Sequence, residues 1–205
     1  VYDESARETG GSRHVRFVTE RIGDTCVPTV TRVAVPASAL SDFSATNREL
    51  RNQGYDRQDR KYVIFAEAEV YCGIGTFTGD TRKGETNRNT SGPSYARADS
   101  RCWTSAIAAH ELGHTLGAVN DDSPNSTGSG HCVDEYDVMC YSDAPRYPKM
   151  VVTCPDRAGD SRLDCNHDDY FSTNPTRGGY LDTHWNSADS RWLESVPGYR
   201  TSTPR

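Results

Sequence analysis

Two histidines four residues apart, His110 and His114, flank a glutamate in a segment that reads H-E-x-x-H-x-x-G over residues 110–117. On a helix, residues four apart lie on the same face, so both imidazoles can reach one metal ion. Neutral imidazole is a good zinc ligand, and the carboxylate of Glu111 can take a proton from a metal-bound water. The motif therefore predicts a hydrolytic zinc site, which still needs a third ligand.

The elements that must position these residues are a helix and a sheet. An alanine-rich helix is expected over residues 104–117, with Thr104 or Ser105 as its cap and Gly117 in the left-handed conformation that ends a helix. Residues 61–71 have the strongest strand pattern and continue into 72–77, whose glycines are typical of a strand that another backbone approaches closely. Further strands are expected at 14–19, 29–36 and 95–99, and a helix from Ser41 or Asp42 to about Gln53.

Composition restricts the possible partners. The net charge is −6 and basic residues are scattered singly, which argues against a nucleic-acid partner, since phosphate binding needs clustered Lys and Arg. No run approaches the roughly 18 apolar residues of a membrane span, so no membrane association is expected. The chain begins at Val1, which we interpret as a processed mature form.

Seven cysteines without any C-x-x-C favour disulfides over a cysteine-rich metal site, and they indicate a secreted, extracellular protein. The odd count leaves one thiol free, or paired with a segment removed in processing. Six cysteines allow about 15 connectivities. The pairs that would close short loops are Cys72–Cys102, Cys132–Cys140 and Cys154–Cys165.

The second half of the chain differs from the first. Residues 118–205 are rich in Asp, Asn, Ser, Gly and Pro and have little periodicity. We expect one catalytic domain over 1–205, of α+β class. Its N-terminal lobe (about 1–117) would hold a mixed twisted β-sheet and the motif helix, and its C-terminal lobe (about 118–205) would be irregular and disulfide-bound.

A second metal is a minor alternative. Asp164, Asn166 and Asp168 place oxygen side chains at alternate positions, as calcium loops do, but the glycine and distal glutamate of an EF-hand are missing. The favoured interpretation is a polar turn held by a Cys154–Cys165 disulfide, with calcium binding left open.

The motif helix resembles the metzincin clan of zinc proteases, whose pattern is H-E-x-x-H-x-x-G-x-x-H, or Asp in the last place, with a methionine turn beneath the metal. Residues 137–141 (DVMCY) resemble that turn, in which Met139 would form a packed hydrophobic floor. The resemblance implies a zincin-like α+β fold. At the place of the clan's third ligand, however, stands Asn120, a neutral amide that binds zinc poorly.

His131 is the favoured third ligand over Asp121 or Asp122. It precedes Met139 by eight residues, a spacing similar to that in the matrixin branch, and imidazole is the commoner zinc ligand. Residues 118–130 then form an inserted loop of turn-forming residues. Tyr141 matches a tyrosine that in the astacin and serralysin branches reaches the metal or the reaction intermediate, and a core position is an equal alternative.

Residues 11–193 also resemble a group of secreted bacterial zinc metalloproteases, through residues 71–75, the motif helix and residues 130–141. That resemblance implies a pro-segment and a monomeric zinc endopeptidase that cleaves proteins or peptides outside the cell. Zinc would be held by His110, His114 and His131, with Glu111 as general base and help from Tyr141. The alternatives are a catalytically inactive zinc-containing binding protein and a zincin with a different third ligand.

Overall fold

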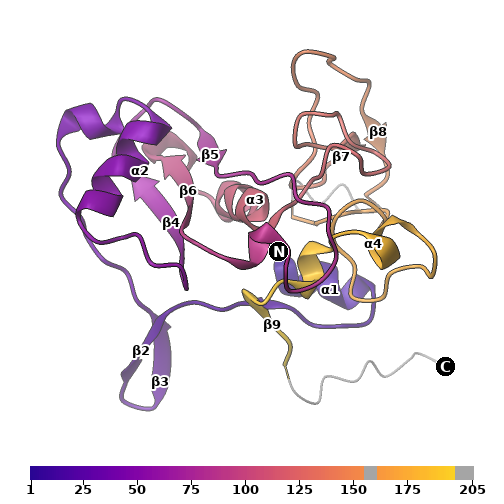
Figure 1. Ribbon diagram of the computed structural model, residues 1–205, viewed down its shortest axis with the longest axis horizontal. Coiled ribbons are helices and arrows are strands. Elements are labelled where there is room, and N and C mark those ends of the chain that lie inside the picture. The colour runs from indigo at the N-terminus through magenta and orange to yellow at the C-terminus, as the bar shows by residue number, and fades with distance from the viewer. Residues whose placement is uncertain (155–160, 197–205) are drawn as a thin grey trace.

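The main sheet has three strands, in the order β4 (Lys61–Ala66), β6 (Ser94–Asp99) and β5 (Gly73–Gly75) (Figure 1). The computed structural model describes residues 1–154 and 161–196. Strand β4 runs parallel to β6 and β5 runs antiparallel to it, which confirms the mixed sheet. All six residues of β6 are buried, as expected of a central strand covered on both faces.

Helix α2 (Phe43–Asn52) packs on one face of the sheet. Asp42 caps it by accepting a hydrogen bond from the Ala45 N–H at 2.7 Å, in agreement with the prediction. The fully buried Arg97 of β6 donates to Thr46 Oγ1 of this helix at 2.7 Å. Since side chains alternate along a strand, Ala96 and Ala98 face the side of the sheet opposite to Arg97.

Helix α3 (Ser105–Leu116) lies on that opposite face, and its bounds agree with the prediction. Thr104 Oγ1 accepts from the Ile107 N–H at 3.2 Å, and Gly117 has φ +86°. The indole N–H of Trp185 donates to the Leu116 carbonyl at 2.7 Å, which satisfies one of the carbonyls left free at the helix end. Every residue from 109 to 116 is buried, so the motif helix is held rigidly inside the protein.

The C-terminal half consists of short elements joined by long irregular segments, which confirms the expected disulfide-bound region. The elements are β7 (Asp134–Glu135), β8 (Val151–Val152), α4 (Tyr180–Thr183) and β9 (Leu193–Glu194). The three disulfides are the predicted ones, Cys72–Cys102, Cys132–Cys140 and Cys154–Cys165. The remaining cysteine, Cys26, is free and exposed.

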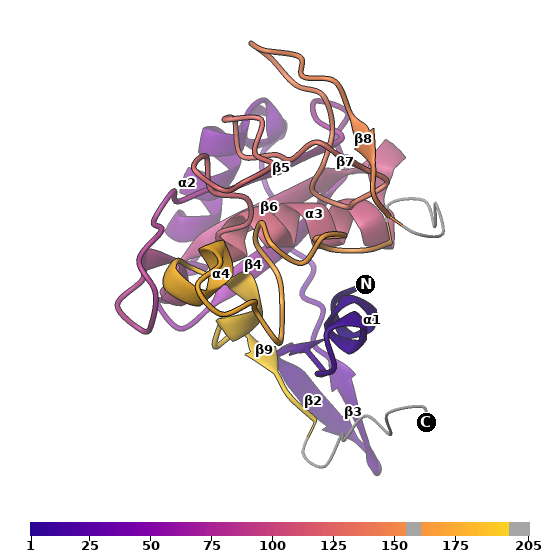
Figure 2. The ribbon, with the colours of Figure 1, turned by 90° about the vertical axis from the view of Figure 1, so that its right-hand side faces the viewer.

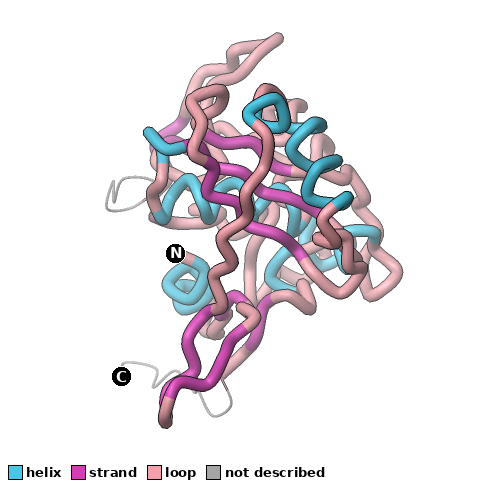
Figure 3. Tube along the Cα trace, turned by 90° about the vertical axis from the view of Figure 1, so that its left-hand side faces the viewer, coloured by secondary structure: helices cyan, strands magenta, loops and turns pink. Residues whose placement is uncertain are grey.

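The N-terminal segment differs from the prediction. The expected strand at 29–36 is wrong: this stretch joins no sheet, and Val30 is 85% exposed. Its polar–apolar alternation satisfies the strand pattern, but within this stretch the backbone forms no ladder: the Thr29 N–H donates to the Val18 carbonyl at 2.7 Å, and residues 30–36 belong to no strand. The expected strand at 14–19 is split into β1 (His14–Val15) and β2 (Thr19–Ile22), and β2 forms a hairpin with β3 (Thr25–Pro28) that extends away from the sheet (Figures 2 and 3).

Helix α1 (Tyr2–Glu8) packs against residues of both halves of the chain. The Tyr2 hydroxyl donates to the Ala109 carbonyl at 2.9 Å, and its ring packs edge-on against Phe171. Strand β1 pairs with β9 near the other end of the described chain. Residues from both predicted lobes therefore share one core, and the division at residue 117 stays a prediction. No helix in the described ranges is long and apolar enough to cross a membrane.

Candidate metal centre

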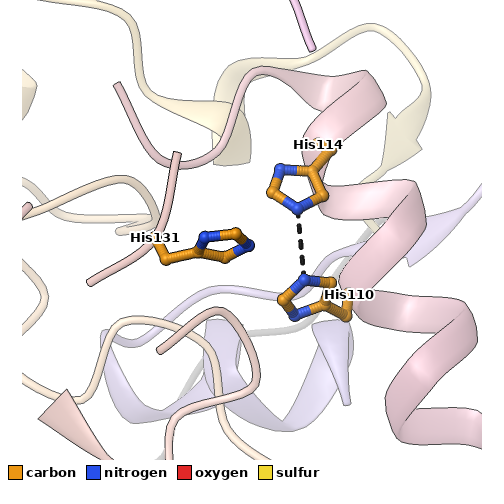
Figure 4. A group of neighbouring side chains, drawn as sticks. All are labelled: His110, His114 and His131. Carbon is orange, nitrogen blue, oxygen red and sulfur yellow. Dashed lines mark hydrogen bonds between the residues drawn. The ribbon is translucent and has the colours of Figure 1, made fainter. Parts of the chain in front are cut away.

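Three buried imidazoles converge beside α3. The nearest ring nitrogens of His110, His114 and His131 all lie within 4.8 Å of one another (Figure 4). Nε2 of His110 and Nε2 of His114 are 3.1 Å apart, close to the roughly 3.4 Å between two nitrogens that share a tetrahedral zinc ion. Nε2 of His131 is buried and has no hydrogen-bond partner among the described residues. A buried ring nitrogen with no hydrogen-bond partner is what a zinc ligand would be in the absence of the metal.

Hydrogen bonds on the far side of two rings set their tautomers. His110 Nδ1 lies 2.6 Å from the Val138 carbonyl oxygen, which can only accept, so Nδ1 carries the proton and Nε2 has a free lone pair. His131 Nδ1 lies 2.6 Å from Asp143 Oδ2 in the same arrangement. Each ring thereby presents its Nε2 lone pair to the other imidazoles.

Burial keeps all three rings neutral, which is the form that binds metal. Desolvation lowers the pKa of His110 to about 4, with a further contribution from the neighbouring His131. It lowers the pKa of His114 well below the usual value, helped by both other imidazoles. Desolvation also lowers the pKa of His131, against the opposing effect of Asp143.

Glu111 lies beside the histidines and beneath strand β5. Its Oε1 is 4.0 Å from His110 Nε2, and burial raises its pKa to about 8. A Cβ atom at Gly73 would lie 2.1 Å from Glu111 Oε1, and one at Gly75 would lie 2.7 Å from the Glu111 carbonyl oxygen. The expectation that another backbone approaches the glycines of this strand is therefore confirmed.

Met139 packs against the motif helix at Gly113. It is fully buried, and its Sδ would lie 2.6 Å from a Cβ at Gly113 of the motif helix. The Met139 N–H donates to Asp137 Oδ1 at 2.7 Å, which supports the turn. The methionine is packed against the helix as the predicted hydrophobic floor.

An open cavity of ≈250 Å³ lies between β5 and the loop that carries His131. Tyr141 lines it and is 47% exposed, so the alternative of a core tyrosine is wrong. Its ring centroid is 4.1 Å from that of His131. The pKa of Tyr141 is raised by burial and by the carboxylates of Asp143 and Glu111.

The carboxylates considered as third ligands have other partners. Asp121 Oδ1 accepts from the Gly130 N–H at 3.0 Å, which closes the inserted loop just before His131. Asp122 Oδ1 accepts from the Tyr180 hydroxyl at 2.5 Å. Asn120 is buried and outside the group of three imidazoles. Asp143 is not among the predicted site residues, because its spacing from His131 matches no pattern and its contact with His131 arises only in the folded chain.

The acidic segment 164–169 forms a turn. Asp164 accepts hydrogen bonds from four successive backbone N–H groups, those of residues 168–171, at 2.7–3.1 Å. Asn166 Nδ2 lies 3.3 Å from Asp134 Oδ2. With the Cys154–Cys165 disulfide formed, these bonds agree with the favoured polar turn, and calcium binding stays a prediction.

Comparison with known proteins agrees with this geometry. Residues 28–144 match the family model of the reprolysin-like metallopeptidases of family M12B, a span that contains β5, α3, all three histidines and the methionine turn. Neither a curated protein nor a solved structure matches the chain. Because the matched span is more than half of the 205 residues and the triad implies zinc, the chain belongs to the M12B reprolysin-like metallopeptidases, zinc peptidases of the metzincin clan.

Proposed function

We propose that this peptidase is a secreted zinc endopeptidase that cleaves extracellular proteins, with His110, His114 and His131 as zinc ligands and Glu111 as general base. The observation that carries the proposal is the convergence of three neutral imidazoles beside a buried glutamate, at the floor of an open cavity. Three protein ligands with an open fourth position are typical of catalytic zinc.

The chemistry divides between the metal and the chain. Bound zinc lowers the pKa of water to about 7 and polarises the peptide carbonyl. Glu111 accepts the proton of the attacking water and delivers it to the leaving amine. Burial raises the pKa of the Glu111 carboxyl to about 8 in the metal-free site, and the positive charge of zinc would favour the ionised carboxylate that a general base needs. Tyr141, at the rim of the cavity, donates a hydrogen bond to the developing oxyanion.

The substrate binds as an added strand. Among the residues that the structure describes, strand β5 pairs only with β6, and it lines the cavity through Gly73, Ile74 and Gly75. An extended peptide that pairs with its other edge would lie across Glu111, because a Cβ at Gly73 would fall within contact distance of the glutamate carboxylate. Edge pairing uses backbone atoms, so it selects extended peptides of many sequences.

The disulfides and the shared core support the proposed compartment and the proposed single domain. Three disulfides require an oxidising compartment, in agreement with secretion. Residues 1–205 act as one catalytic domain, since α1, α3 and C-terminal residues contribute to the same hydrophobic cluster. We expect a monomer as the active form, because the three imidazoles and Glu111 line one cavity of a single chain and the proposed chemistry needs no residue of a second copy.

Zinc content and turnover of three variants test this proposal. His131→Ala should lose zinc affinity by orders of magnitude, whereas Asp121→Ala should retain zinc, because Asp121 binds a loop N–H instead. Glu111→Gln should keep zinc and lose about 10²–10⁴-fold in kcat against a peptide substrate. Full zinc affinity in His131→Ala would show that the third ligand is another residue. A zinc-loaded wild type without peptidase activity would favour the inactive binding protein.

A further inference from the structure

His131 differs from the other two imidazoles in how it is held. His110 and His114 lie on a buried helix, whose backbone fixes the direction of both side chains. His131 follows Gly130, which has φ +81°, in a segment without regular structure. Its orientation must therefore come from contacts of its own side chain.

The contact that orients His131 is with Asp143. The two side chains are 11% and 12% exposed, and Nδ1 lies 2.6 Å from Oδ2. An ionised carboxylate only accepts hydrogen bonds, so the ring donates from Nδ1 and its Nε2 is left to face His110 and His114. The other oxygen of Asp143, Oδ1, is buried and has no hydrogen-bond partner in the described part of the chain.

The backbone segments on either side of this pair are also joined. The Cys132–Cys140 disulfide links the residue after His131 to the methionine turn, three residues before Asp143. On the other side, the Ser129 hydroxyl donates to the Ala144 carbonyl at 3.0 Å. The disulfide and the Ser129–Ala144 hydrogen bond therefore hold the segment that carries Asp143 next to the segment that carries His131.

We propose that Asp143 is a positioning residue of the metal site: it fixes the Nδ1–H tautomer and the ring direction of His131. This inference rests on the proposed role of His131 as a ligand. A carboxylate behind a zinc-binding imidazole also makes the ligand more basic, and its loss lowers metal affinity by about 10–100-fold. Asp143 orients His131, whereas the helix backbone orients the other two histidines.

The first test uses the metal-free wild type. Nitrogen-15 NMR of the histidine side chains distinguishes Nδ1–H from Nε2–H imidazole. We expect His131 as the Nδ1–H tautomer, and its assignment as the Nε2–H tautomer would overturn the proposal without any variant.

The second test measures zinc dissociation constants by chelator competition and the visible spectrum of the cobalt-substituted protein. Asp143→Asn should bind zinc about 10–100-fold more weakly and shift the cobalt spectrum, because the amide lacks the charge that makes the imidazole more basic and its NH2 group can face Nδ1 and leave the tautomer unfixed. Asp143→Glu, which keeps the carboxylate, should recover much of the affinity. The control Glu135→Gln removes one charge from the same half of the chain, at a half-buried position in β7, and should bind zinc as the wild type does.

The outcomes separate this inference from the proposed function. Loss of zinc in His131→Ala together with wild-type affinity and an unchanged cobalt spectrum in Asp143→Asn would refute the role of Asp143 alone. Wild-type zinc affinity in His131→Ala would refute the assignment of the ligand itself. Equal losses in Asp143→Asn and Glu135→Gln would indicate a general charge effect and would also count against Asp143.

Discussion

Replacing Gly73 with alanine should leave the fold intact and remove most of the peptidase activity. The added Cβ would lie 2.1 Å from Glu111 Oε1 and 2.7 Å from its Cδ, whereas ordinary contacts begin at 3.4 Å. The carboxylate oxygen must therefore move by about 1.3 Å, and a misplacement of about 1 Å near the reacting atoms costs about 10²-fold in rate. Because the obstacle is the end of a flexible side chain, strand β5 can stay in place.

The neighbouring glycine provides the contrast. A Cβ at Gly75 would lie 2.7 Å from the Glu111 carbonyl oxygen and 3.0 Å from His114 Cβ, both held by the helix. Gly75→Ala should therefore displace the strand and cost about 1–3 kcal/mol of stability. Gly79→Ala is the matched control, since its Cβ would meet only the Phe77 ring at 3.6 Å.

The assay is kcat and KM on a fluorogenic peptide, together with the zinc Kd and the denaturant midpoint of each variant. Gly73→Ala should lose about 10²-fold in kcat with zinc Kd and stability close to wild type. Gly79→Ala should resemble the wild type in every measurement. Wild-type kcat in Gly73→Ala would refute the conclusion that the strand fixes the position of the general base.

Three further predictions concern stability. Burial, helped by the charge of Asp164, raises the pKa of Asp169 from 3.8 to about 8, so between these values the folded chain binds more protons than the unfolded chain. Stability of the metal-free protein should fall as pH rises through that window, by up to about 1.4 kcal/mol per pH unit for this group, and Asp169→Asn should flatten the profile measured by denaturation. Arg97→Met should cost about 3–5 kcal/mol in the same assay, because the buried carboxylate of Asp99 loses its cation. Replacing Cys132 and Cys140 with alanine should cost about 2.5 kcal/mol and weaken zinc binding through His131, measured by denaturation and chelator competition.

Each of these predictions has a contradicting result. Identical pH profiles for wild type and Asp169→Asn would show that this carboxyl ionises normally in the fold. A loss below about 1 kcal/mol in Arg97→Met would mean that water or another cation compensates the partner carboxylate. An unchanged zinc Kd in the double cysteine variant would show that the disulfide does not hold the third histidine.

Local rules predicted the helices well. The cap at Thr104 and the left-handed Gly117 delimit α3, and Asp42 begins α2, because each signal acts within one helical turn of the residue that supplies it. The same rules failed over residues 29–36, because a strand also needs a partner and alternation says nothing about where one lies. A strand is expected at 14–19, but nothing in the sequence indicates that β1 pairs with β9, which lies near the other end of the described chain.

For the site, the sequence alone determined that His110, Glu111 and His114 occupy one stretch of helix. At 3.6 residues per turn, two histidines four residues apart lie on one face without any help from the rest of the chain. The methionine turn and its spacing indicated His131, but proximity to the other imidazoles comes from tertiary structure, which closes a 17-residue separation from His114. Tertiary structure alone decided that Asp143 meets His131, that Gly73 lies over the carboxylate of Glu111, and that Asp121 binds a loop N–H. These contacts depend on how loops and an edge strand pack around α3, and packing between distant segments leaves no periodic trace in the chain.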